Sequence, residues 1–193
     1  KELPADVYDS AIAYFDAELH RLFEGLRERG ALDRTLVVLT SDHGESLGEW
    51  GRWNHGHLDT ANLHVQLSVA FPDHRGAGTR VSTQVRSIDI APTILAAVGA
   101  PPLGGIDGES LLELVSASGA GRDRRAWAYG SSNNRGITLY SGDLQLSFQD
   151  SAFPPIAGAT SAFDLTADPG GLIDVSGREA SKVEAFRGEV ARV

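Results

Sequence analysis

Cysteine and methionine are both absent from the 193 residues of this sequence. Without cysteine there can be no disulfide, no thiolate metal ligand and no cysteine nucleophile within these residues. The sequence begins with Lys1, and its first residues are not those of a signal peptide. We therefore expect a piece of a longer chain, and the sequence assigns no cellular compartment.

Long hydrophobic runs and an excess of basic charge are missing as well. No apolar run approaches the ~18 residues that cross a bilayer, so no membrane segment is predicted. The formal net charge is -9, which disfavours a nucleic acid backbone as the partner but leaves open a small anionic substrate held by a local metal ion. A hydrophobic content of 41% is ordinary for one globular unit with its own core.

The strongest signal is an apolar run that ends in an Asp-His pair. Residues 35–40 read Thr-Leu-Val-Val-Leu-Thr and predict a strand buried on both faces. Open α/β sheets bind ligands just beyond the carboxyl ends of such strands, where Asp42 and His43 follow. An oxygen from Asp42 and a nitrogen from His43 suit a metal ion, and Gly44 lets the backbone turn away. The alternative is that Asp42 caps the next turn and His43 is an ordinary loop residue.

Periodicity divides the rest of the chain into helices and strands. Apolar residues recur at three- and four-residue steps from Ala5 to Arg29, which predicts one long helix. Further strands are expected at 65–71 and 81–85, and helices at 88–99 and 107–115.

Beyond residue 126 the pattern predicts an antiparallel appendage. Strands are expected at 126–129, 136–140, 143–148 and 162–165. Ser141-Gly142 is a hairpin turn signal, and a final helix is expected at 179–193.

These segments, in order, resemble the C-terminal half of the sulfatase family in the alkaline-phosphatase-like superfamily. Ser41 to Glu49 is similar to the family run Ser-Asp-His-Gly-Glu-x-x-Gly-Glu, and Asp89 to Thr93 is similar to its Asp-x-x-Pro-Thr helix. Residues 163–170 resemble its closing Asp-Leu and Asp-Pro turn.

The resemblance implies an α/β fold with an alkaline-phosphatase-like sheet flanked by helices. A small C-terminal antiparallel β plus helix appendage would complete it. Residues 1–193 would then form a single, truncated sulfatase-type domain, with 1–115 in the central α/β core and 126–193 in a β-rich subdomain.

The resemblance also implies metal-dependent hydrolysis of small-molecule or glycan sulfate esters. It assigns Asp42 and His43 to the metal, with calcium favoured by oxygen ligands and manganese or zinc admitted by the histidine. His55 falls where many sulfatases carry a Lys or His that contacts the sulfate or the leaving oxygen, so it is the catalytic and substrate-binding candidate. His57 is a second substrate-binding candidate. For both histidines the alternative is a loop residue bonded to backbone.

The family's Cys/Ser-x-Pro-x-Arg motif, whose first residue becomes formylglycine, and its early Asp-Asp pair do not occur in this sequence. We therefore expect the nucleophile and half of the metal shell to lie on a missing N-terminal part. The isolated chain is predicted to be inactive and to bind metal poorly, because two ligands cannot close a site.

Two rival functions remain open. The first is phosphoester or phosphonate hydrolysis, or phosphoethanolamine transfer, because relatives with those activities share the Ser-Asp-His-Gly-Glu run. The second is a non-catalytic α/β binding module. Convergence of Asp42, His43 and His55 on one point would favour an enzyme over the module.

Several residues that invite functional roles are expected to be structural. The two glutamates Glu45 and Glu49 should cap a turn or pair with Arg52, and Asp89 should cap its helix. The tryptophans at 50 and 53 should pack their loop down.

Overall fold

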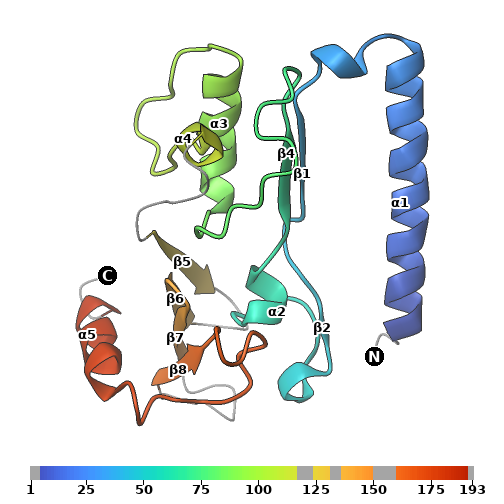
Figure 1. Ribbon diagram of the computed structural model, residues 1–193. Coiled ribbons are helices and arrows are strands. Elements are labelled where there is room, and N and C mark those ends of the chain that lie inside the picture. The colour runs from blue at the N-terminus through green and yellow to red at the C-terminus, as the bar shows by residue number, and fades with distance from the viewer. Residues whose placement is uncertain (1–4, 117–123, 131–135, 150–159, 191–193) are drawn as a thin grey trace. The chain divides into compact units, whose positions relative to one another are not determined.

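The computed structural model describes residues 5–116, 124–130, 136–149 and 160–190 (Figure 1). Its contacts divide the chain into two units, one holding Lys1–Ser41 and Gln66–Arg122 and the other Asp42–Val65 and Asp123–Val193. The segment that follows the Asp-His pair therefore belongs to the second unit, together with the C-terminal strands. The expected division of a single domain into residues 1–115 and 126–193 stays a prediction.

The first unit opens with α1 (Ala5–Glu28), as the apolar spacing predicted. Gly30 follows at φ 59, a conformation that glycine adopts without strain and that commonly ends helices. No residue of α1 is buried, and Ile12, Phe15 and Leu22 are each more than half exposed. Spacing thus predicts which residues share a helix face, but not whether another element covers that face.

A two-stranded antiparallel sheet follows, formed by β1 (Val37–Thr40) and β4 (Leu67–Ala70). The predicted burial of β1 on both faces is wrong, because its residues are half-buried or exposed. In the described part of the chain β4 is the strand that pairs with β1, so aliphatic side chains on the sheet remain partly accessible. The strand predicted at 81–85 is also wrong, since these residues form no helix or strand.

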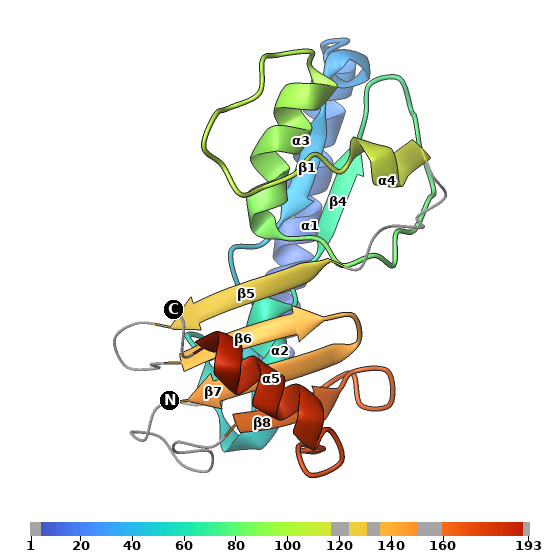
Figure 2. The ribbon, with the colours of Figure 1, turned by 90° about the vertical axis from the view of Figure 1, so that its left-hand side faces the viewer.

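The helix α3 (Ile90–Ala97) packs on this sheet, as both views of the ribbon show (Figures 1 and 2). Ile90 and Thr93 line one small cavity together with Val38 and Val69 of the two strands. The 3₁₀ turn η3 (Ser87–Asp89) precedes α3, and the short helix α4 (Leu112–Ser116) follows.

Asp89 is fully buried, but its carboxylate does not cap α3 as predicted. Its Oδ2 accepts the backbone N–H of Arg86 at 2.8 Å, and its Oδ1 accepts the N–H of Glu109 at 2.9 Å. Arg86 Nη2 donates a further bond to Oδ1 at 2.9 Å. The carboxylate therefore joins the segment before the helix to the loop that leads into α4.

The second unit contains a four-stranded antiparallel sheet in the order β5-β6-β7-β8. Its strands are β5 (Arg125–Gly130), β6 (Gly136–Ser141), β7 (Leu144–Gln149) and β8 (Thr160–Asp164). The helix α5 (Ala180–Val190) lies across one face, in front of the sheet in Figure 2. The predicted antiparallel appendage with its final helix is confirmed, including the turn after Ser141; residues 191–193 lie outside the described ranges.

The two faces of this sheet differ in chemistry because side chains alternate along each strand. The strand register aligns Trp127, Leu139, Leu146 and Ala162 in one apolar row, and this row packs against α5. Phe186 of α5 stacks on Trp127, with ring centroids 6.0 Å apart. The opposite face carries buried polar residues, Thr138, Gln145, Ser147 and Ser161.

Candidate functional site

The candidate site lies on the segment Asp42–Val65 of the second unit. Two short strands, β2 (Ser46–Leu47) and β3 (Trp53–Asn54), pair antiparallel with Ser46 opposite Asn54. The 3₁₀ turn η2 (Glu49–Gly51) connects them. Continuing this register by one residue places Glu45 opposite His55, so the hairpin itself brings these two side chains together.

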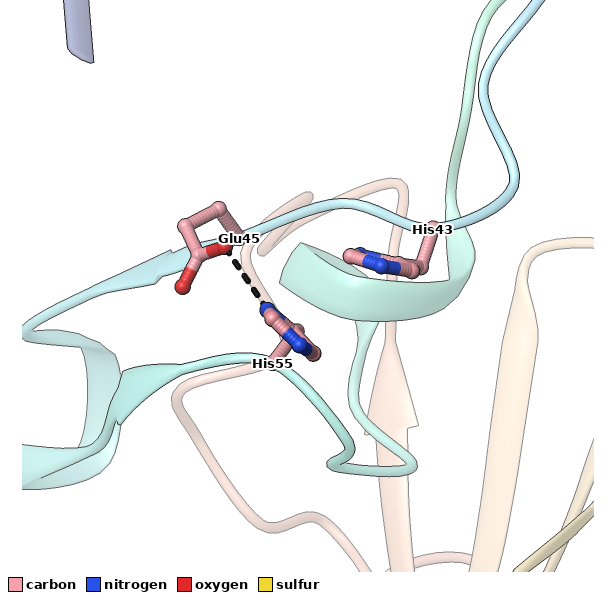
Figure 3. Close-up of side chains that lie close together, drawn as sticks. All are labelled: His43, Glu45 and His55. Carbon is pink, nitrogen blue, oxygen red and sulfur yellow. Dashed lines mark hydrogen bonds and ion pairs between the residues drawn. The ribbon is translucent and has the colours of Figure 1, made fainter.

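Three side chains form a cluster at the open end of the hairpin (Figure 3). His55 Nδ1 lies 3.1 Å from Glu45 Oε2. The ring of His43 stacks on the ring of His55 with centroids 4.2 Å apart. One ligand atom from each of the three residues can be chosen so that all lie within 4.8 Å of one another. The Glu45 side chain is 16% exposed and the two histidines are about half exposed, so the cluster can be reached by solutes.

The hydrogen bonds of the two rings indicate their tautomers. His43 Nδ1 lies 2.9 Å from the carbonyl oxygen of Gly44. A carbonyl only accepts, so Nδ1 carries the proton, and in the neutral ring Nε2 carries the lone pair. The same argument applies to His55, whose Nδ1 donates to the Glu45 carboxylate. Each ring therefore presents Nε2 as its acceptor or metal ligand.

The other predicted site residues lie outside this cluster of three. The Asp42 carboxylate accepts the backbone N–H of His43 at 3.0 Å, and its other oxygen lies 3.7 Å from His43 Nε2. With 87% of its side chain exposed, Asp42 extends into solvent beside the cluster. His57 is half-buried, and its backbone N–H donates to Asn62 Oδ1 at 3.3 Å.

Asn62 is a buried residue that hydrogen-bonds to the chain next to His43 and Glu45 and to the chain after His55. It is 2% exposed, and its Nδ2 donates to Ser46 Oγ at 2.6 Å and to Asp59 Oδ1 at 3.0 Å. Its carbonyl oxygen accepts the N–H of Gly44 at 2.8 Å. These bonds tie the backbone that carries His43 and Glu45 to the short helix α2 (Thr60–Leu63).

Gly44 is needed for this close approach rather than for a sharp turn. A Cβ atom at this position would lie 2.0 Å from the carbonyl oxygen of Ala61, closer than any real contact. Its φ is not among the positive values of the chain. A side chain here would therefore push the Asp-His segment away from α2.

The polar face of the four-stranded sheet supports α2 in turn. Thr60 Oγ1 donates to Gln145 Oε1 at 2.6 Å, and Thr138 Oγ1 donates to the carbonyl oxygen of Leu58 at 3.0 Å. Burial raises the pKa of the neighbouring Tyr140 to about 12. The buried polar residues of β6 and β7 thus fix the backbone that follows His57.

Glu49 and Trp50 of η2 have structural roles, as predicted. Glu49 Oε2 accepts the N–H of Leu47 at 2.7 Å, which confirms the turn cap. Trp50 Nε1 donates to the carbonyl of Gly171 at 3.1 Å, and its ring contacts Phe163 of β8.

One expectation for the charged residues of this segment is wrong. Arg52 forms an ion pair with Asp59, at 3.1 Å between Nη1 and Oδ2. Glu45 does not cap a turn but belongs to the cluster with the two histidines. The signal that sequence reasoning missed is the antiparallel register of two strands of only two residues each, which lies below the length that alternation can detect.

The cluster offers two imidazole nitrogens and one carboxylate oxygen. This donor set fits zinc, manganese or another transition metal better than calcium, which prefers six to eight oxygen ligands. Asp42 adds a second carboxylate next to the cluster and with it negative charge that attracts cations. Across the described residues no helix is both long and apolar enough to cross a lipid bilayer.

Comparison with known proteins gives consistent matches. The sequence profile of the Sulfatase family matches residues 3–100. Arylsulfatase K of Xenopus laevis is 30% identical over 191 residues, which cover 92% of this chain and 34% of that protein. The chain spans about a third or less of the length of these curated relatives.

Two solved structures share the fold over most of the chain. One was determined in complex with its substrate D-glucosamine-2-N,6-O-disulfate; it aligns with a TM-score of 0.79 at 22% identity, covering 94% of this chain and 39% of that one. The other is a phosphonate monoester hydrolase from Silicibacter pomeroyi, with a TM-score of 0.69 at 25% identity, covering 92% and 38%.

Proposed function

The chain belongs to the sulfatase family, and we propose that it supplies part of an active site that hydrolyses sulfate esters with the help of a divalent metal ion. Its fold is the alkaline-phosphatase-like α/β fold of that family, with a four-stranded antiparallel sheet and a helix in its C-terminal part. One observation carries the proposal: the rings of His43, just before β2, and His55, just after β3, stack 4.2 Å apart at the open end of the hairpin.

Asp42 and His43 are the proposed ligands of the catalytic metal. A divalent ion bound here supplies positive charge next to the equatorial oxygens of the ester, where negative charge builds during hydrolysis. Calcium suits a shell made mainly of carboxylates, and the imidazole of His43 also admits manganese or zinc.

His55 is the proposed catalytic residue for the substrate. Its ring is oriented by the bond from Nδ1 to Glu45, so Nε2 faces away from that carboxylate. A protonated Nε2 binds the sulfate oxygens or donates a proton to the leaving oxygen. His57, two positions later on the same loop, is proposed to contact the substrate as well.

The nucleophile is proposed to come from outside these residues. The sequence has no cysteine and no Ser-x-Pro-x-Arg motif, so a formylglycine and the Asp-Asp pair would be supplied by another part of a longer sulfatase. On this proposal the isolated chain hydrolyses no ester.

A sulfated sugar is the proposed substrate class. One solved structural neighbour was determined with a glucosamine disulfate as its substrate. Hydrolysis of phosphonate or phosphate monoesters is the second candidate, favoured by the phosphonate monoester hydrolase at 25% identity. The two ester groups are similar in shape and charge, so a cation and a histidine suit both.

Joining the chain to the missing parts of the domain tests the proposal. We would replace the matching segment of the Xenopus laevis arylsulfatase K with this chain and measure release of sulfate from an aryl sulfate, beside hydrolysis of a phosphonate monoester. The folded chimera is expected to release sulfate, and the isolated chain is expected to release none.

Each other outcome has a distinct meaning. Phosphonate turnover without sulfate release would replace the first function by the second. A chimera that folds, by circular dichroism, and hydrolyses neither ester would contradict the enzyme proposal. Turnover by the isolated chain would contradict the external nucleophile.

A further inference from the structure

A half-open cavity of about 160 Å³ lies between the helix α5 and the four-stranded sheet of the second unit. We propose that it binds a small aromatic carboxylate, with the ring inside the cavity and the acid group at its mouth. The residues that line the cavity come from β5, β6, β7 and α5, and so lie apart from the β2–β3 hairpin. The inference therefore does not depend on the proposed hydrolysis of esters.

The cavity lies on the α5 face of the sheet, opposite the face that supports α2. Side chains alternate along a strand, so Leu139 and Ser141 of β6 point towards α5. Thr138 between them in this alternation points to the other face, where it bonds to the carbonyl oxygen of Leu58. Figure 2 shows α5 lying across the sheet on the cavity side. The sheet itself thus separates a ligand in the cavity from the candidate functional site.

Two small side chains leave this volume unfilled. Ala185 lies on the face of α5 that lines the cavity, between the longer side chains of Lys182 and Glu189. On the sheet, Ser141 is the cross-strand partner of Leu144, and both line the cavity. A side chain of leucine size at position 141 or 185 would occupy space that protein interiors normally fill.

The floor of the cavity is apolar and buried. Leu139 and Leu146, which pair across β6 and β7, are 1% and 4% exposed, and Phe186 is 1% exposed. An apolar cavity of ~150 Å³ is large enough to hold one benzene ring. A sugar would leave its hydroxyl groups without hydrogen-bond partners on this floor. Volume and lining therefore favour a single aromatic ring, which Phe186 can contact.

The rim of the cavity carries two cations and one carboxylate. Arg125 Nη2 donates to Glu189 Oε2 at 2.8 Å, and the guanidinium carbon lies 5.5 Å from the centre of the Trp127 ring, so this cation is held on two sides. Lys182 pairs with Glu179 at 2.9 Å, but its side chain is 58% exposed, and ion pairs at such positions contribute little. The Lys182 ammonium group can therefore exchange Glu179 for the acid group of a ligand.

These charges favour an acid over an amine. The charged residues that line the cavity are Arg125, Lys182 and Glu189, so the lining has one net positive charge. Glu189 already accepts a hydrogen bond from Arg125, and an ammonium ligand would have to compete with that arginine. A carboxylate instead meets two hydrogen-bond donors, the Lys182 ammonium and the Ser141 hydroxyl.

Titration of the ¹⁵N-labelled 193-residue chain with benzoate, followed by NMR, tests the site. Saturable amide shifts are expected in β6, β7 and α5, with a Kd on the order of 1 mM for a ligand of this size. Benzamide has the same shape without the charge and should bind about fivefold more weakly. Shifts confined to residues 42–65, or no saturation at all, would overturn the inference.

A charge variant tests the acid group of the ligand. Lys182→Gln should weaken benzoate binding about fivefold and leave benzamide binding unchanged. Arg178→Gln removes the same charge from the exposed turn before α5 and is the matched control, which should leave both affinities unchanged. An equal loss of benzoate binding in the two variants would show that only the net charge of the chain attracts the ligand.

A volume variant tests the position of the ring. Ala185→Leu should fill the cavity and abolish binding of both benzoate and benzamide. Ala185 is exposed at the mouth, so the fold is expected to survive, which circular dichroism checks. An unchanged benzoate Kd in this variant would place the ligand elsewhere and contradict the proposal. Neither result bears on sulfate release by the chimera, so the site and the proposed function can fail separately.

Discussion

The side-chain amide of Asn62 donates to the hydroxyl of Ser46 at 2.6 Å, with both residues buried. This contact is central to the site, because Ser46 follows Glu45 and Asn62 also binds the backbone N–H groups of Gly44 and His57. A single amide side chain and its own backbone therefore bind both segments that carry the candidate histidines.

Removal of this amide should destabilise the second unit. Asn62→Ala leaves the buried hydroxyl of Ser46 and the N–H of His57 without their partner, which costs ~2–4 kcal/mol of unfolding free energy. Urea unfolding followed by tryptophan fluorescence measures it, because all three tryptophans belong to the second unit. In a double-mutant cycle with Ser46→Ala the coupling energy should be ~1 kcal/mol or more, and a value near zero would contradict the contact.

A methyl group at position 44 should also lower the unfolding free energy of the second unit. Gly44→Ala places Cβ against the carbonyl of Ala61, a backbone atom that cannot rotate away, so we expect a loss of ~2 kcal/mol or more. Gly177→Ala is the matched control in the same unit, because a Cβ there meets nothing within 4 Å. If Gly44→Ala and Gly177→Ala had equal unfolding free energies, the segment near Gly44 would be able to shift without loss of stability.

The buried carboxylate of Asp89 should stabilise the first unit. Asp89→Ala removes the acceptor of four hydrogen bonds and leaves Arg86 without its ion pair to this carboxylate, at a cost of ~3 kcal/mol. Amide hydrogen exchange in α3 reports this loss directly. Asp73→Asn, whose partner Arg75 is exposed, is the control and should leave exchange unchanged.

Stability should fall at alkaline pH through Tyr140. Its pKa is 10.0 in an ordinary setting and about 12 in the folded chain, because burial disfavours the phenolate. Below pH 10 both states keep the proton; between pH 10 and 12 the unfolded state loses it first, so ~2 kcal/mol of stability is lost over that window. Tyr140→Phe should remove this fall, measured as urea midpoints at pH 9 and pH 11. An identical pH slope in the variant would contradict the assignment.

Sequence reasoning predicted the elements that have strong local signals. The helix α1 and the strands β5 to β8 follow from apolar spacing and from the turn after Ser141. The strand expected at 81–85 was wrong because its β-branched residues predict extended backbone but cannot supply a neighbouring strand to pair with.

The site was only partly predictable for a related reason. His43 and His55 were identified from the family motif and its spacing. Glu45 lies beside them because of a hairpin with strands of two residues each, which is too short for a sequence pattern to predict. Asp89 likewise looked like a helix cap, while one of its hydrogen-bond donors, the backbone N–H of Glu109, lies twenty residues downstream. Long-range contacts of this kind depend on tertiary packing, which local propensity does not contain.

The activity of His55 variants in the arylsulfatase chimera tests the central claim most directly. His55→Ala should lower kcat/KM for an aryl sulfate by ~10²–10⁴, as expected for loss of a general acid or an oxyanion contact, while Glu49→Gln should leave it unchanged. A folded His55→Ala chimera that retains the parent kcat/KM would show that this histidine takes no part in sulfate ester hydrolysis.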